Sequence, residues 1–145
     1  MDVRSSLMFS ELMEARAKKS PSERALVFLE NGEDETAVLS YSDLHERAKV
    51  IARHLKDRGL DGERIMLLFP SGADYVAALL GCIYSGAIAV PAYPPRNNYH
   101  ARRIAVIARD SGAHAALALS HHCADISNRL KMLEENWDGD VIPLI

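Results

Sequence analysis

The sequence predicts an α/β fold, in which a helix and a β-hairpin precede alternating strands and helices on a mainly parallel sheet. Apolar residues recur with helical spacing in several segments, and short apolar runs of strand length lie between these segments. Glycine, proline or serine separates most segments from the next. From residue 41 onward the order is helix then strand, four times over, which favours right-handed crossovers onto parallel strands.

The first forty residues predict the opening helix and the hairpin. Apolar residues recur at helical spacing from Leu7 to Ala17, and a basic turn followed by Pro21 ends the run. Two strand-like segments, ALVFLE (25–30) and TAVLS (36–40), flank Asn31 and Gly32 with the acidic residues 33–35. This arrangement is typical of a β-hairpin.

A second helix is expected after Ser42, its N-cap, and it should end at Arg58, just before Gly59. Its apolar stripe consists of Leu44, Ala48, Ile51, Ala52 and Leu55. The run RIMLLFP (64–70) then predicts a strand that is covered on both faces. Ser71 is expected to cap the next helix, residues 72–85, which is apolar nearly all round and should be largely buried.

The remaining elements continue the alternation. We expect a strand at residues 87–92, a helix at 98–111 that stops at Gly112, and a strand at 114–119. The apolar run 87–90 should be covered on both faces. Ile126, Leu130 and Leu133 mark one more helix, and VIPLI (141–145) predicts a last strand. Because this strand has no helix after it to cover it, we expect residues 1–145 to be a single unit, an incomplete subdomain of a larger domain.

Three prolines within five positions end the apolar run GAIAV, namely Pro91, Pro94 and Pro95. Proline has no amide proton, so Pro91 requires a strand end or an edge, and the other two require an extended exit toward the next helix. The sequence thus predicts a rigid elbow at the carboxyl end of a parallel strand, where α/β proteins bind ligands. The candidate loop residues are Tyr93, Pro94, Pro95 and Arg96.

Composition narrows the classes of function. With 17 Lys and Arg against 20 Asp and Glu, the net charge is −3, which makes a nucleic-acid partner improbable. Cys82 and Cys123 are far apart and lack a paired spacing, and the N-terminus carries charges where an export signal would be apolar, so a cytoplasmic protein with reduced thiols is expected. Residues 75–95 are uncharged, yet their glycines and prolines argue against a membrane span.

Few motifs carry chemistry by themselves. The sequence has no glycine-rich nucleotide loop, no nucleophile elbow and no HExxH pattern. His121 and Asp125 share one helical face but give only two ligands, so no metal site is expected. Four arginines fall within residues 96–109, and a phosphate-bearing ligand or an acidic partner could use them. Arg102, Arg103 and Arg109 are the candidates for docking an acidic partner, although a solvated helix face is the simpler interpretation.

Two segments together resemble a known family. LSYSDL (39–44) before a helix and YSGAIAVPAYPP (84–95) about forty residues later resemble the first two core motifs of the adenylate-forming enzymes. The AVPAYPP form is similar to the fatty acyl-AMP ligases, and the similarity extends from about Leu7 to Ile145. The resemblance implies the N-terminal part of the large domain of such a ligase.

The resemblance also implies a two-step reaction for the parent enzyme. A fatty acid reacts with ATP, with magnesium as the accompanying ion, to give an acyl-adenylate and pyrophosphate. The phosphopantetheine thiol of an acyl carrier protein then takes the acyl group, and AMP leaves. In this family the phosphate loop, the ribose-binding acid and the catalytic lysine come later in the chain. We therefore expect no catalytic residue, no bound ATP and no activity in these 145 residues alone.

Two alternatives stay open from the sequence. The chain could belong to a fatty acyl-CoA ligase, in which coenzyme A replaces the carrier protein as acceptor. It could instead be a non-catalytic module, in which the first helix or the arginines at 96–109 dock an acidic carrier protein.

Overall fold

The computed structural model describes residues 8–133 and 137–144. The helices are α1 (Phe9–Lys19), α2 (Tyr41–Asp57), α3 (Ala73–Ser85), α4 (Asn98–Ser111) and α5 (Ser120–Lys131). The strands are β1 (Arg24–Glu30), β2 (Asp34–Ser40), β3 (Arg64–Leu68), β4 (Ile88–Ala92), β5 (Ala115–Ala118) and β6 (Asp140–Pro143). The expected α/β order is therefore confirmed, while the expected first and last residues, Leu7 and Ile145, lie outside the described residues.

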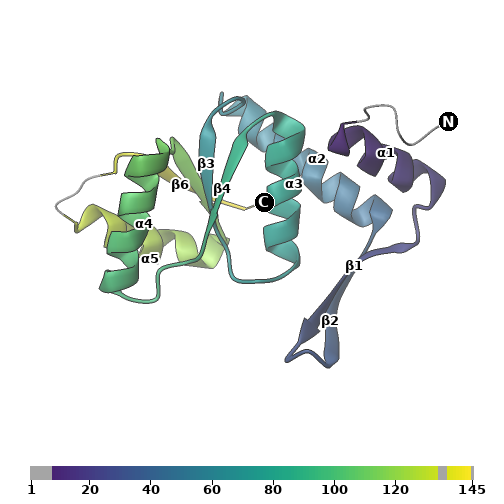
Figure 1. Ribbon diagram of the computed structural model, residues 1–145, viewed down its shortest axis with the longest axis horizontal. Coiled ribbons are helices and arrows are strands. Elements are labelled where there is room, and N and C mark those ends of the chain that lie inside the picture. The colour runs from purple at the N-terminus through teal and green to yellow at the C-terminus, as the bar shows by residue number, and fades with distance from the viewer. Residues whose placement is uncertain (1–7, 134–136, 145) are drawn as a thin grey trace.

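The strands form two separate sheets. Strands β1 and β2 pair as an antiparallel hairpin, which projects away from the body of the molecule (Figure 1). The other four strands pair in parallel in the order β4-β3-β5-β6. Two neighbouring parallel strands must be joined by a crossover connection, which here contains a helix. Helical and strand-like patterns of apolar residues therefore alternate along the sequence.

Helices cover both faces of the parallel sheet. Figure 1 shows α2 and α3 on one side of the strands and α4 and α5 on the other. Alternate residues of β3 divide between the two layers: Ile65 and Leu67 pack with α2 and α3, whereas Met66 and Leu68 pack with α4 and α5. All four side chains are fully buried. After the exposed Arg64, the run IMLL is apolar throughout because both of its faces are core.

The observed ends of the helices agree in part with those expected from the sequence. Helix α4 has the predicted bounds, and Gly112 ends it in the left-handed conformation at φ 69°. Helix α2 begins two residues earlier than expected, because Ser40 rather than Ser42 is its N-cap: the Ser40 hydroxyl accepts from the amide of Asp43 at 3.1 Å. The expected cap of α3 is also wrong, since Gly72 precedes the helix and no side chain caps it.

Strand β4 departs from the expectation that its apolar run would be covered on both faces. It is an edge strand of the described sheet, and Ile88 at its start is 49% exposed. Pro91 lies inside the strand, opposite Leu67, rather than at its end. The Ile88 amide donates to Glu63 of the neighbouring segment at 2.8 Å, so by alternation the nitrogen of Pro91 faces the free edge. Proline costs no ladder hydrogen bond there.

None of the helices in the described ranges, 8–133 and 137–144, is long and apolar enough to cross a membrane. The uncharged segment 75–95 divides instead between α3, a turn at Gly86 with φ 81°, β4 and the elbow. Gly86 is needed at this turn because a left-handed backbone is unfavourable for other residues.

Candidate functional site

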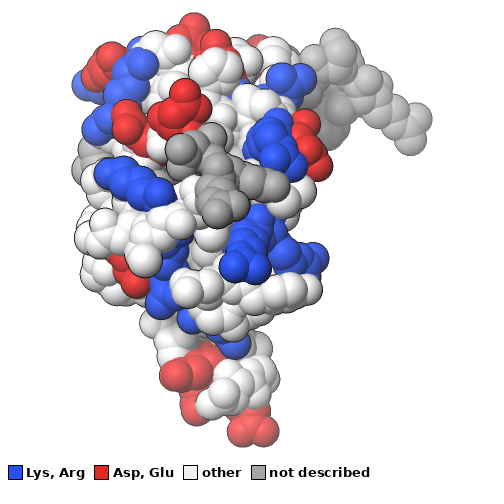
Figure 2. All heavy atoms as spheres, turned by 90° about the vertical axis from the view of Figure 1, so that its left-hand side faces the viewer, with Lys and Arg blue, Asp and Glu red and all other residues white. Residues whose placement is uncertain are grey.

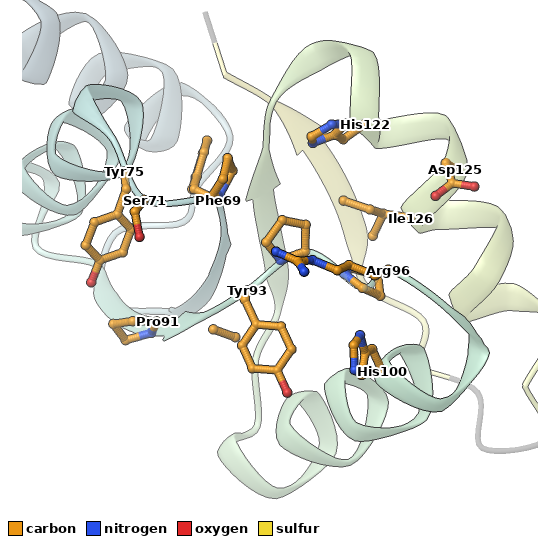
Figure 3. Close-up of a pocket in the computed structure, with 14 residues that line it drawn as sticks. Phe69, Ser71, Tyr75, Pro91, Tyr93, Arg96, His100, His122, Asp125 and Ile126 are labelled. Carbon is orange, nitrogen blue, oxygen red and sulfur yellow. The ribbon is translucent and has the colours of Figure 1, made fainter. Parts of the chain in front are cut away.

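A cleft of about 1070 Å³ opens at the carboxyl ends of β3 and β4. Its walls come from the segments after these strands and from the first turns of α4 and α5 (Figure 3). The residues that line it are Phe69, Pro70, Ser71, Tyr75, Pro91, Ala92, Tyr93, Pro94, Pro95, Arg96, His100, His122, Asp125 and Ile126. The carboxyl ends of parallel strands meet at one edge of a sheet, and the cleft lies at that edge.

All four candidate residues of the elbow lie in this cleft. Pro95 is buried, Pro94 is half-buried, and Tyr93 and Arg96 are exposed to the opening. The Tyr93 ring meets the edge of the His100 ring with 5.9 Å between their centroids, so the first turn of α4 holds the phenol against the wall. The elbow therefore contributes two rigid apolar rings, one aromatic ring and one cation to the cleft.

The polar groups of the opposite wall come from α5. Asp125 accepts from Arg129 on the same helix at 2.9 Å, and Arg129 also donates to Asn98 of α4 at 3.3 Å. These contacts join the two helices behind the cleft. Asp125 is thus already paired with a cation of its own helix.

Two histidines of the cleft have a ring nitrogen without a partner. The Nδ1 atoms of His100 and His122 are buried and accept or donate no hydrogen bond among the described residues. Figure 3 places Arg96 between these two rings, with His122 on the α5 side and His100 on the α4 side. A buried nitrogen without a partner is costly, so polar groups of this kind merit a functional explanation.

The three arginines expected to dock a partner lie outside the cleft. Arg102 and Arg103 are exposed on α4, on the side opposite to its buried alanines, and Arg109 lies near the end of the helix, 3.9 Å from Asp110. Figure 2 shows the face that carries α4 and α5, on which Lys and Arg form several separate patches and most Asp and Glu lie above and below them. The elbow and the docking candidates are therefore two distinct surfaces.

Neither cysteine is suited to chemistry. Cys82 is fully buried in α3, and burial raises the pKa of its thiol to about 12. Burial also raises the pKa of the Cys123 thiol. Both are free, and within the described ranges no three His, Cys, Asp or Glu residues come together in a way that could hold a metal ion.

Comparison with known protein families shows to which family the chain belongs. The model of the family described as AMP-binding enzyme matches residues 13–143, which is nearly the whole chain. The chain belongs to this family. Among solved structures, this AMP-binding chain is similar to a fatty acyl-adenylate ligase from Legionella pneumophila in complex with acyl adenylate and pyrophosphate, with a TM-score of 0.77 and 30% identity. That likeness covers 93% of this chain and 23% of the other.

Curated relatives of the AMP-binding chain include two kinds of ligase. A medium-chain fatty acid–acyl-carrier-protein ligase of Moorena producens is 42% identical over 85 residues, which cover 59% of this chain and 14% of the relative. A long-chain fatty acid–AMP ligase of Mycobacterium tuberculosis is 32% identical over 137 residues, which cover 92% of this chain and 23% of the relative. This chain thus spans at most about a quarter of the length of these relatives.

The sequence alone did not predict the whole wall of the cleft. The sequence indicates Asp125 only as a metal-ligand type, paired with His121 and not with His122, whereas the position of Asp125 and His122 after β5 is the informative feature. His100 and Tyr75 were missed, because nothing in their local pattern distinguishes them from other half-buried helical residues. The rule that parallel strands end at one edge could have grouped them with the elbow.

Proposed function

We propose that the chain is the leading part of a fatty acyl-AMP ligase, in which it forms an incomplete N-terminal subdomain. The main support is the match of the AMP-binding family over residues 13–143, together with relatives whose names specify fatty acids and acyl-AMP formation. The whole enzyme would join a fatty acid to AMP with release of pyrophosphate and then pass the acyl group to an acyl carrier protein. It would work in the cytoplasm.

ATP and magnesium would bind elsewhere in the whole enzyme. The described residues offer no cluster of carboxylates for a magnesium ion, and the sequence has no glycine-rich phosphate loop. Adenylation needs groups that stabilise the charge developing on the phosphates, and the family resemblance places the phosphate loop and the catalytic lysine that do so later in the ligase. In this proposal the 145 residues act as a scaffold and as one wall of the site.

The elbow would wall the acyl or pantetheine side of the ligase site. Tyr93, Pro94, Pro95 and Arg96 line a cleft at the carboxyl edge of the sheet, the usual position of ligands in α/β proteins. The two rings of Pro94 and Pro95 fix the backbone, so a ligand would meet a surface that is already ordered.

The exposed arginines of α4 would meet the carrier protein. Arg102, Arg103 and Arg109 lie on one helix away from the cleft, and an acidic partner would be steered toward such charges. A relative that is named as an acyl-carrier-protein ligase supports this acceptor over coenzyme A.

A pyrophosphate-release assay tests the ligase proposal. A longer protein that begins with these residues should release pyrophosphate when given ATP, magnesium and a long-chain fatty acid. The purified 145-residue chain should release none above background, because the charge-stabilising groups are missing. Turnover by the short chain, or its absence from the long protein with every fatty acid supplied, would contradict the proposal.

Carrier protein and coenzyme A as acceptors are distinguished in the second half-reaction. The acyl-adenylate formed by the long protein is offered either holo acyl carrier protein or coenzyme A, and the two transfer rates are compared. Faster transfer to the carrier is expected. A substitution of Arg102 and Arg103 by Gln should slow transfer to the carrier and leave pyrophosphate release unchanged.

A further inference from the structure

We propose that the elbow cleft binds a phosphate group through Arg96 together with His100 and His122. The proposal rests on the proposed function, because it names the ligand chemistry of the cleft to which that function assigns a role. It starts from an uncompensated charge: Arg96 is exposed at the cleft and makes no hydrogen bond or ion pair within the described ranges. A planar guanidinium with five donors is the side chain that best fits an oxyanion.

The acid of the cleft does not neutralise this cation. Asp125 is the one carboxylate among the lining residues, and its Oδ2 is bound by Arg129 at 2.9 Å. The lining therefore carries an unpaired positive charge, while its negative charge is already matched from outside the cleft. A cation would be repelled by Arg96, and an anion would be attracted.

The two histidines add donors on either side of Arg96. His100 comes from α4 and His122 from α5, and both line the cleft. Each has a buried Nδ1 without a partner. In the proposed site, each ring turns this nitrogen toward the ligand. A bound oxyanion would then supply the missing hydrogen bond to each ring.

The backbone around the cleft also favours an anionic ligand. Helix α3 starts after Gly72 and helix α5 after Leu119, and neither of these positions provides a side-chain acceptor for the first amides. Ser71 and His122 line the cleft beside these two helix starts. The positive ends of the helix dipoles thus reinforce the field of Arg96.

The number of donors favours phosphate over carboxylate. One guanidinium and two imidazoles, which project from three different segments, match a tetrahedral group with three acceptor oxygens better than a planar group with two. In the proposed ligase, ATP binds elsewhere, so this group would come from the phosphopantetheine arm of a carrier, and a nucleotide is the other source that the test must distinguish. Binding of each compound to the chain distinguishes the two sources.

The test is an NMR titration of the isotopically labelled 145-residue chain at pH 6.5. Inorganic phosphate, AMP and 4′-phosphopantetheine are added separately, with acetate as the carboxylate control. We expect saturable shifts of the Arg96, His100 and His122 resonances, with a dissociation constant for phosphate on the order of 1 mM, and only small, non-saturating shifts with acetate. The organic phosphate that binds more tightly than inorganic phosphate identifies the source.

Variants give the matched control. Arg96→Gln should weaken phosphate binding about tenfold, whereas Arg53→Gln, which removes an exposed arginine of α2 outside the cleft, should leave it unchanged. His122→Gln, which keeps a polar side chain of similar size, should give an intermediate loss. Equal affinities for Arg96→Gln and the parent chain, or no saturable shift with any phosphate, would overturn the phosphate proposal without touching the ligase proposal, which rests on pyrophosphate release.

Discussion

Gly81 of α3 lies directly against Ile51 of α2, with no room for a side chain between them. A Cβ atom added at Gly81 would lie 2.7 Å from Cβ of Ile51 and closer still to its Cγ2. Both residues are buried in the core between the two helices. The glycine therefore sets how closely α2 and α3 approach, and the contact carries the first prediction.

Gly81→Ala should destabilise the chain although alanine favours helices. Alanine contributes about 1 kcal/mol in helix propensity, whereas overpacking a well-filled core costs about 1–3 kcal/mol. The obstructing atoms belong to the branched stem of Ile51, which cannot swing away, so the cost should fall at the upper end of this range. We expect a net loss of about 1–2 kcal/mol in the free energy of unfolding, measured by urea denaturation.

A double-mutant cycle gives the control for this contact. In an Ile51→Ala background the space beside Gly81 is open, so the cost of Gly81→Ala should disappear or change sign. An unchanged cost in that background would show that the destabilisation comes from elsewhere in α3.

The burial of Cys82 makes a prediction about pH. Its thiol pKa is about 12 in the folded chain and about 9 in an unfolded one, so the folded state binds the proton more tightly. This contribution to stability is fully present below pH 9 and is lost as the pH rises from 9 toward 12. The free energy of unfolding should fall through this window by up to roughly 1.4 kcal/mol per pH unit from this group.

The variant Cys82→Ala separates the contribution of this thiol to the pH dependence of stability from the contributions of lysines and tyrosines, which titrate in the same pH range. The difference in unfolding free energy between parent and variant should be constant from pH 7 to 8.5 and should shrink above pH 9. A difference that stays constant up to pH 10.5 would mean that burial does not raise the pKa of the Cys82 thiol in the folded chain. Thiol alkylation at neutral pH should likewise reach the half-buried Cys123 before Cys82.

Much of the fold could be predicted because each element has a local signal. Helix α4 was predicted with its bounds since an amphipathic repeat ends at a left-handed glycine, Gly112. The cap of α2 was less certain: Ser40 and Ser42 both precede the helix, and only the three-dimensional reach of the hydroxyl to the Asp43 amide separates them. Local patterns give the type of an element more reliably than its first residue.

The exposure of β4 and the full wall of the cleft could not be predicted in the same way. An apolar run such as AIAV has the same composition in the middle and at the edge of a sheet, and the order β4-β3-β5-β6 is a property of the whole chain. His100 and His122 are 22 positions apart in the sequence, and they line one cleft because the strands before them, β4 and β5, end at the same edge of the sheet, on either side of β3. Pro91 was the one residue whose chemistry indicated an edge in advance.

Pro91 should protect the free edge of β4 from pairing with another chain. Its nitrogen faces outward, so Pro91→Val would add an outward amide without removing a hydrogen bond to β3. We expect stability to change by less than about 1 kcal/mol and self-association to increase, as measured by sedimentation velocity at rising concentration. Pro21→Val, outside the sheet, should stay as monomeric as the parent chain. A variant at position 91 that unfolds would show that the proline is needed for the strand itself.

The elbow itself is tested by replacing Pro94 and Pro95 together with Ala in the longer ligase. Each proline restricts its own backbone and that of the residue before it, so the change frees the segment from Tyr93 to Pro95. If this segment walls the acyl or pantetheine side of the site, its loss of order should slow acyl-adenylate formation or acyl transfer by about tenfold or more. The two rates are measured separately, by pyrophosphate release and by loading of the carrier protein.

Replacing Pro21 and Pro143 by Ala removes the same number of prolines, both exposed and outside the cleft, and should change neither rate. If the Pro94 and Pro95 variant keeps its fold and both of its rates, the elbow serves packing alone.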